Sequence, residues 1–314
     1  MKNDSENKPG ISHVFGPVPS RRLGRSLGVD VVPFKTCSYN CIYCQVGLTT
    51  NCTIERREWV PLDAVLREVR EKLDKKPDYI TISGSGEPTL YSRLGELIDG
   101  IKAMTDVPVA VLTNGSLLWM PQVRKDLMNA DLVSPTLDAG DERTFVEINR
   151  AHAGVAFEQM VEGLIEFRAE YKGKYWLEVF LVEGVNATEV QVSRMARIAS
   201  RVSPDRVQLN TVVRPPAEIF ALKVPRRKME SLAELFTPKA EIIVDYQGGY
   251  KEIGLEGRCQ DVLELVKRRP CTVADLAAGL ALHRNEVVKY VDELVDEGKI
   301  VGDVRDDGVY YRTK

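Results

Sequence analysis

The sequence predicts an α/β protein in which six βα units in series are followed by a small α+β domain. Two observations support this division. Between residues 26 and 247, short runs rich in Val, Ile, Leu and Thr alternate with amphipathic stretches, and several runs are almost continuously apolar, as buried parallel strands are. Four glycines then fall within residues 248–257, and the alternation stops after them.

These patterns set the expected boundaries of the elements. We expect an N-terminal extension at 1–25, the βα series at 26–247, a linker at 248–258 and the second domain at 259–314. The expected strands are 27–33, 79–83, 107–113, 132–137, 175–182, 206–213 and 241–246. The expected helices are 62–75, 93–104, 121–128, 157–171, 189–201 and 226–236. The first of these helices has apolar residues at spacings of three and four, with charged residues between them.

A series of βα units forces parallel strands joined by helical crossovers. Two architectures satisfy that requirement, an open doubly wound sheet and a barrel. In both, ligands bind at the C-terminal ends of the strands. The unusual residues of this sequence lie at those ends.

The second domain has the pattern of a winged helix. Helices are expected at 262–267, 272–280 and 284–297, with Thr272 as an N-cap before Asp275, and a hairpin at 300–312 with its turn at 306–308. Winged helices often bind DNA through the third helix.

The charge of the second domain argues against DNA as a partner. Residues 258–314 carry ten Lys or Arg against eleven Asp or Glu, a net charge of −1 rather than a basic footprint. His283, Arg284, Asn285 and Lys289 form a small patch at the start of the third helix. We expect substrate presentation, RNA contact or dimerisation instead.

Three of the six cysteines, Cys37, Cys41 and Cys44, fall within eight residues just after the first strand. This spacing places three thiolates in one loop, which suits an iron–sulfur cubane with one iron left open for chemistry. A structural zinc site would need a fourth ligand, and the nearest candidate, Cys52, is eight residues on. A disulfide is not expected in a reducing cytoplasm, and free buried cysteines are rarely packed so densely.

Polar and glycine residues gather where three successive strands end. They are Gly84, Gly86 and Glu87 after the second strand, Thr113 and Asn114 after the third, and Thr136 and Asp138 after the fourth. Glycines let a backbone approach a ligand closely, and hydroxyl, amide and carboxylate groups can bind a ribose or a carboxylate. The same residues are common in turns and caps. Their position beside the cysteine loop favours a ligand site.

The Cys-x3-Cys-x2-Cys motif, with Tyr43 before its third cysteine and a loop position after the first strand, resembles the radical SAM superfamily over roughly residues 29–213. The resemblance implies an α/β partial (β/α)6 barrel of radical SAM type, followed here by the small α+β winged-helix domain. It implies a 4Fe–4S cluster on the three cysteines, with S-adenosylmethionine (SAM) as the second cofactor.

The resemblance also implies which residues contact SAM. The segment at Gly84, Gly86 and Glu87 would hold the amino group, although Ser85 either replaces a glycine of the family's segment or lengthens the turn. Thr113 and Asn114 would face the carboxylate, Thr136 and Asp138 the ribose, and Tyr43 would flank the adenine. Asn186 and Asn210 are weaker candidates for the adenine or methionine end, with backbone satisfaction as their alternative role.

The sequence GPVPSRRLGR at 16–25, with CQVG at 44–47, resembles one radical SAM branch, the tRNA wyosine-synthesis enzymes and their bacterial relatives. Those enzymes resemble a two-cluster design with extra cysteines before the motif. No cysteine precedes Cys37, so neither the wyosine reaction nor an auxiliary cluster is implied. Arg21, Arg22 and Arg25 precede the first strand and either enter the barrel from its N-terminal side or form a solvated basic loop.

The function implied is reductive cleavage of SAM to a 5′-deoxyadenosyl radical that takes hydrogen from a substrate, with RNA and peptides as candidates. An electron donor such as flavodoxin or ferredoxin is implied as a partner. The alternatives are an iron–sulfur redox-sensing DNA-binding regulator and an electron-transfer protein, which would need a fourth cysteine. Glu87, Asp138 and Arg214 are candidates for a second catalytic residue.

Composition adds limits to the cellular setting. A formal charge of −3 gives no general attraction to nucleic acid. The longest apolar runs, such as 107–112, are too short to span a bilayer, and residues 1–10 lack an apolar signal region. We therefore expect a cytoplasmic protein without membrane partners.

Overall fold

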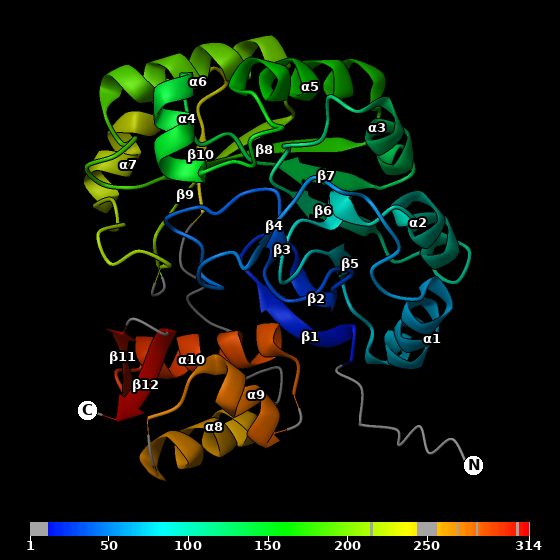
Figure 1. Cartoon of the computed structure of the whole chain (residues 1–314), viewed down its shortest axis with the longest axis vertical. Helices are drawn as coiled ribbons and strands as arrows, with labels where there is room; N and C mark the ends of the chain where they lie inside the picture. Colours follow the sequence, from blue (N-terminus) through cyan, green and yellow to red (C-terminus); the bar gives the residue numbers. More distant parts are fainter. Residues whose placement is uncertain are drawn as a thin grey trace.

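The computed structural model describes residues 12–213, 216–243, 256–268, 270–280, 282–305 and 308–313. Eight strands form one sheet in the order β1-β2-β5-β6-β7-β8-β9-β10 (Figure 1). They are β1 (Val14–Ser20), β2 (Gly24–Val29), β5 (Tyr79–Ile82), β6 (Val109–Thr113), β7 (Leu132–Pro135), β8 (Lys174–Leu181), β9 (Arg206–Thr211) and β10 (Glu241–Ile242). All neighbours after β1 are parallel. The predicted partial (β/α)6 barrel is confirmed.

Helices cover the outer side of this sheet, as Figure 1 shows for α1, α2, α3, α5 and α6. The helices of the barrel are α1 (Leu62–Lys72), α2 (Leu94–Lys102), α3 (Pro121–Leu127), α4 (Glu142–Asn149), α5 (Phe157–Glu170), α6 (Glu189–Val202) and α7 (Arg226–Ala233). The outward strand residues are apolar and fully buried, such as Val109 and Val111 of β6. Their burial against helices such as α2 forms the main core.

Two elements of the barrel were not predicted. The extension at 1–25 contributes β1, which pairs antiparallel with β2 at the sheet edge. The Glu68 carboxylate of α1 holds the start of β1 by accepting from the backbone N–H groups of His13 and Val14 at 2.7 and 3.1 Å. Helix α4 also forms, capped by Asp141, whose carboxylate accepts from the Thr144 N–H at 2.9 Å. The strand expected at 241–246 is described for two residues, and 244–246 lie outside the described part.

The C-terminal domain follows its predicted order. It consists of α8 (Glu256–Arg268), α9 (Val273–Leu280), α10 (Arg284–Asp296) and a hairpin of β11 (Ile300–Arg305) and β12 (Gly308–Thr313). Thr272 caps α9 as expected, because its Oγ1 accepts from the Asp275 N–H at 3.1 Å. The domain has its own apolar core, around Val262 and Val287. Most of the expected linker and the turn residues 306–307 fall outside the described residues.

The small domain lies beside β1, with α10 nearest to the barrel (Figure 1). Within the described part of the chain, each helix is too short or too polar to cross a membrane.

Candidate functional site

The cysteine loop is anchored at both of its ends and along its length. Its ends pair as two short parallel strands, β3 (Thr36–Cys37) and β4 (Asn51–Cys52). Its middle rests on the C-terminal end of α4, where the carbonyls of Ile148 and Asn149 accept from the N–H groups of Ile42 and Asn40 at 3.0 and 2.9 Å. The Ile42 side chain is buried in the main core. The sequence therefore fixes the loop over the C-terminal ends of the strands, as predicted.

A nitrogen donor faces each of the three sulfurs, and each donor comes from a different part of the fold. Asn114 Nδ2, after β6, lies 3.6 Å from Cys37 Sγ, and Asn149 Nδ2, at the end of α4, lies 3.5 Å from Cys41 Sγ. Lys35 Nζ lies 3.4 Å from Cys44 Sγ and also donates to the carbonyl of Gly47. Donors aimed at sulfur stabilise the thiolate form and tune the potential of sulfur-bound clusters.

Two of the three thiols, those of Cys37 and Cys41, are difficult to ionise on their own. Burial raises the pKa of the Cys37 thiol to about 12, and the nearby Glu87 carboxylate adds to the shift. Burial, followed by the charges of Asp138 and Cys37, raises the pKa of the Cys41 thiol well above its usual range. A bound metal cation reverses the preference for the protonated thiol, because a thiol that coordinates a metal loses its proton. Three mutually coupled thiols with N–H donors fit a group that carries positive metal ions.

The spacing of the ligands differs between a cluster and a single metal ion. Among the described residues, no three His, Cys, Asp or Glu side chains converge closely enough to hold one metal ion. A mononuclear zinc centre requires such convergence. In a cubane each cysteine ligates a different iron, so its sulfurs stand farther apart than ligands of one ion. Cys52 is exposed, and its Sγ lies 3.8 Å from the Ser38 carbonyl oxygen.

The glycine turn after β5, residues 84–87, is hydrogen-bonded to the start of the cysteine loop. The Ser85 carbonyl accepts from the Lys35 N–H at 2.8 Å, and the Glu87 N–H donates to the Thr36 carbonyl at 3.1 Å. A Cβ on Gly86 would lie 1.7 Å from that carbonyl oxygen, so the close approach requires glycine. A Cβ on Gly84, where φ is +156°, would lie 2.4 Å from the Asp30 carboxyl. Gly86 therefore sets the spacing between the turn and the cysteine loop, and Gly84 sets the spacing between the turn and Asp30.

Glu87 joins the ends of two strands. Its buried carboxylate accepts from Thr89, from the Thr113 hydroxyl at 2.6 Å and from the Asn114 N–H at 2.7 Å. Burial raises the pKa of this carboxyl, while the surrounding donors oppose the rise. The Asn114 side chain is itself held in place, because its Nδ2 donates to Ser38 Oγ at 2.9 Å. These predicted residues do lie together, and their polar groups hold the strand ends in place.

Asp138 and Tyr43 belong to a second group of hydrogen-bonded side chains. The Asp138 carboxylate accepts from the Tyr43 hydroxyl, from Asn149 Nδ2 at 2.8 Å and from the Phe180 N–H at 3.1 Å. Burial raises the pKa of the Asp138 carboxyl to about 7. The Tyr43 ring stacks on Phe180 with centroids 3.9 Å apart. A planar aromatic shelf beside a carboxylate suits a nucleoside.

Two further predicted residues, Thr136 and Asn186, hold the Glu87 and Asp138 groups in place. The Thr136 hydroxyl is within 3.4 Å of the Thr113 carbonyl oxygen, which links the third and fourth strand ends. Asn186 is fully buried; its Nδ2 donates to the backbone carbonyls of Asp138 and Phe180, and its Oδ1 accepts from the Val182 N–H. Asn186 thus positions Asp138 through the backbone.

The barrel lumen also holds charged residues that are paired. Arg22 enters the lumen and pairs with Glu178 of β8, with side chains 15% and 13% exposed. Asn210 also donates to Glu178, at 2.9 Å, and its Oδ1 lies 3.4 Å from Arg21 Nη1. Although burial opposes it, the Arg22 charge holds the pKa of Glu178 below its usual range. Asn210 therefore belongs to the network of Arg22 and Glu178.

Sequence reasoning missed several residues of the site. Asn149 came from a helix that was not predicted, and Phe180 is an apolar residue within a strand. Lys35 precedes the cysteines by two residues and adopts φ of +62°, an uncommon conformation for a non-glycine residue. Its place next to the motif was the available signal. Arg214, a candidate catalytic residue, lies outside the described residues.

An open hollow of about 590 Å³ lies at the opposite end of the barrel, where Pro108, Asp131, Lys174 and Asp205 precede the strands. Catalytic groups of such barrels lie at the C-terminal ends of the strands, so this hollow is not the candidate site.

Comparison with known proteins places this geometry in context. The sequence model of the family described as the Radical SAM superfamily matches residues 31–195. The UPF0026 protein MJ1312 of Methanocaldococcus jannaschii is 36% identical over 314 residues, covering 95% of this chain and 94% of that protein. A protein of Brachyspira hyodysenteriae named GTPase Obg is 41% identical over 308 residues, or 95% of this chain. The chain spans 45% of the length of that relative.

Among solved structures, a radical SAM methyltransferase from Sphaerobacter thermophilus has a similar fold. The TM-score is 0.53 at 16% identity, covering 71% of this chain and 67% of the methyltransferase. At this identity the similarity concerns the fold.

Proposed function

Because the chain belongs to the radical SAM superfamily of enzymes, we propose that Cys37, Cys41 and Cys44 ligate a 4Fe–4S cluster that binds SAM. When bound, these cofactors supply one-electron cleavage of SAM to methionine and a 5′-deoxyadenosyl radical, which takes a hydrogen atom from the substrate. The observation that carries the proposal is the set of three sulfurs, each faced by a separate nitrogen donor.

The chain's own residues would orient SAM across the strand ends. Tyr43, stacked on Phe180, offers an aromatic face to the adenine. The Asp138 carboxyl, with Thr136 beside it, would accept from the ribose hydroxyls. The turn at Gly84, Gly86 and Glu87 would meet the amino group with backbone atoms, and Thr113 and Asn114 would lie at the carboxylate. Asn186 would act as a positioning residue behind Asp138.

Burial of these groups supports exclusion of water from the radical. Asp138 and Glu87 are 4% and 2% exposed. A closed site protects a reactive radical from side reactions. An electron donor such as flavodoxin or ferredoxin would supply the electron, and the substrate, an RNA or peptide among the candidates, would enter the lumen.

The test is anaerobic reconstitution with iron and sulfide, followed by SAM and dithionite. We expect a cluster of four irons and formation of 5′-deoxyadenosine, measured by iron assay, electron paramagnetic resonance and mass spectrometry. Alanine variants of Cys37, Cys41 and Cys44 should each lose both signals, and Cys52→Ala, the matched control, should keep both. Loss of the cluster in Cys52→Ala, or a cluster that never yields 5′-deoxyadenosine, would contradict the proposal.

A further inference from the structure

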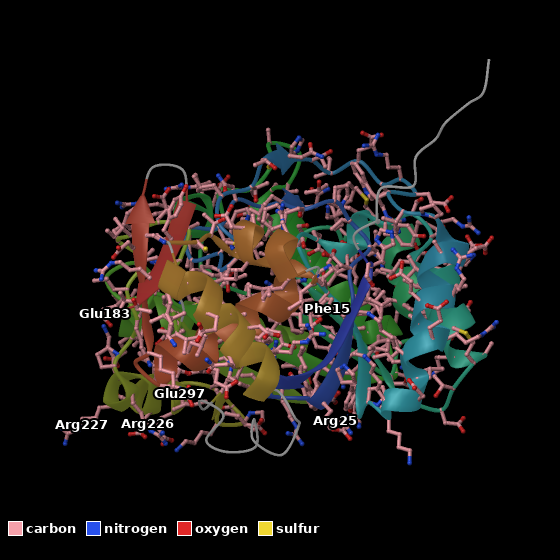
Figure 2. The ribbon with its side chains drawn as sticks, turned by 90° about the horizontal axis from the view of Figure 1, so that it is seen from below. Phe15, Arg25, Glu183, Arg226, Arg227 and Glu297 are labelled. Carbon is pink, nitrogen blue, oxygen red and sulfur yellow. The ribbon has the colours of Figure 1, made fainter. Side chains whose placement is uncertain are left out.

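The start of α10 docks on the barrel instead of facing solvent. The His283 ring stacks on the Phe15 ring of β1 with centroids 4.4 Å apart and planes at 12°. Figure 2 shows Phe15 at the seam between β1 and the helices of the small domain. His283 Nδ1 accepts from the Asn285 N–H at 3.1 Å, which leaves the proton on Nε2, 3.5 Å from the Asp30 carboxylate. The Arg284 guanidinium lies 3.8 Å from the centre of the Phe34 ring.

A glycine in the sheet makes this docking possible. The Phe15 ring lies flat over Gly28 of β2, and a Cβ at Gly28 would come within 2.1 Å of the ring. His283 is 8% exposed and Asp30 is 5% exposed, so the contact is a buried seam. The patch expected to face a partner at the start of the third helix is therefore used, in part, within the chain.

A cavity of about 220 Å³ opens next to this seam, and both domains line it. From the barrel it takes inward residues of β2, β5 and β6, together with Gly84 and the residues that directly follow Cys44. From α10 it takes Asn285, Val288 and Lys289. The cavity thus adjoins both the cysteine loop and the glycine turn. It is smaller than the sites of drug-sized ligands, which usually exceed about 300 Å³.

The polar lining favours a negatively charged ligand. It contains the Lys289 ammonium and the Asn285 and Gln45 amides, of which Lys289 and Gln45 also have partners within the chain. The Ser26 and Thr81 hydroxyls line it too and hydrogen-bond to each other at 2.6 Å. Among the described residues, no Asp or Glu lines the cavity. Asn285 Nδ2 is buried and makes no hydrogen bond within the described part of the chain. A buried amide donor without an acceptor is costly, which an oxyanion would relieve.

We propose that the cavity between α10 and the barrel binds a small ligand, or one end of a larger one, that carries a carboxylate or phosphate group. Its identity as the substrate rests on the proposed function, because the cavity adjoins the cysteine loop. The small domain then supplies part of the substrate site, with Asn285 and Lys289 as the groups that recognise the anion.

The test measures binding of inorganic phosphate and of succinate to the reconstituted full-length protein by ligand-observed NMR. We expect saturable binding of one of the two probes, which tells phosphate from carboxylate. Asn285→Asp is nearly isosteric and places a negative charge in the cavity, so it should weaken binding by about tenfold or more. An aspartate in the first turn also suits a helix, so α10 should persist, as circular dichroism and thermal melting would verify.

Lys289→Met should weaken binding similarly, whereas Lys125→Met, an exposed control on α3, should leave it unchanged. Binding of neither probe, equal binding by Asn285→Asp, or displacement of the probe by SAM would overturn the inference. Failure of the two proposals is distinguishable. Formation of 5′-deoxyadenosine without probe binding removes this inference alone. Probe binding without SAM cleavage removes the proposed function, and with it the ligand's identity as the substrate, but leaves the anion site.

Discussion

Replacing Asp138 by asparagine should make the protein's stability respond to pH in a predictable direction. Burial raises the pKa of the Asp138 carboxyl to about 7, although Tyr43, Asn149 and the Phe180 N–H all donate to it. The ordinary value is about 4. The folded chain thus holds a proton that the unfolded chain releases. The contribution of this carboxyl to stability is full below about pH 4 and is lost as the pH rises through 7.

The magnitude follows from the size of that shift. At about 1.4 kcal/mol per unit of the span between pH 5 and the folded pKa, the wild type loses about 2 kcal/mol of folding free energy by pH 7 and about 3 kcal/mol by pH 9. Asparagine does not titrate. Its amide nitrogen must face a donor, either the Phe180 N–H or Asn149 Nδ2, which costs about 1–3 kcal/mol. Asp138→Asn should therefore be the less stable protein in acid, and at least as stable as wild type at pH 9.

The assay is urea unfolding of the chelator-treated protein, followed by circular dichroism at pH 5, 7 and 9. The wild-type stability minus that of Asp138→Asn should fall by about 3 kcal/mol over this range. The exposed control Asp106→Asn should stay within about 0.5 kcal/mol of wild type throughout. A difference for Asp138→Asn that does not change with pH would refute the reasoning. Weaker SAM binding by the same variant would show what the buried carboxylate is kept for.

Two further predictions concern charges near the barrel axis. Glu178→Gln should lower the free energy of unfolding by about 3–5 kcal/mol, because Arg22 is left buried without its partner. Glu230→Gln, in an exposed pair on α7, should cost about 0.5 kcal/mol or less in the same denaturation series. Similar losses in the two variants would contradict the pairing argument. Lys35→Met should lower the reduction potential of the reconstituted cluster by tens of millivolts in a redox titration, since a positive charge beside a cysteine ligand favours the reduced cluster. The same potential in Lys35→Met and in the control Lys125→Met would rule out this role for Lys35.

The strand ends were predictable because parallel strands place their C-terminal ends on one edge of a sheet. Asp138 and Tyr43 are 95 residues apart in sequence, yet this rule alone brings them together. Their detailed roles were not predictable. Nothing in the local sequence distinguishes Asn186, which only satisfies backbone groups, from Asn149, which reaches both Cys41 and Asp138.

Helix α4 escaped prediction because its local signals conflict. The β-branched residues at 144, 146 and 148 lower helix propensity. The Asp141 cap and burial of Phe145 and Ile148 outweigh that preference. Strand β1 escaped for a similar reason, since Pro17 and Pro19 argue against a strand. Prolines are tolerated at a sheet edge, which is where β1 lies.

Two buried carboxylates of the barrel, Glu178 and Asp138, lie in opposite electrostatic settings. The positive charge of Arg22 holds the pKa of Glu178 below its usual range, so this ion pair is complete within the chain. At the C-terminal end, the hydrogen-bond partners of Asp138 are a hydroxyl, an amide and a backbone N–H, all of them neutral, and the carboxyl's pKa is raised. A buried acid that its neighbours leave poorly compensated is the one whose energy a ligand can still change. That contrast separates Glu178, whose charge is matched within the chain, from Asp138, which lies where chemistry is expected.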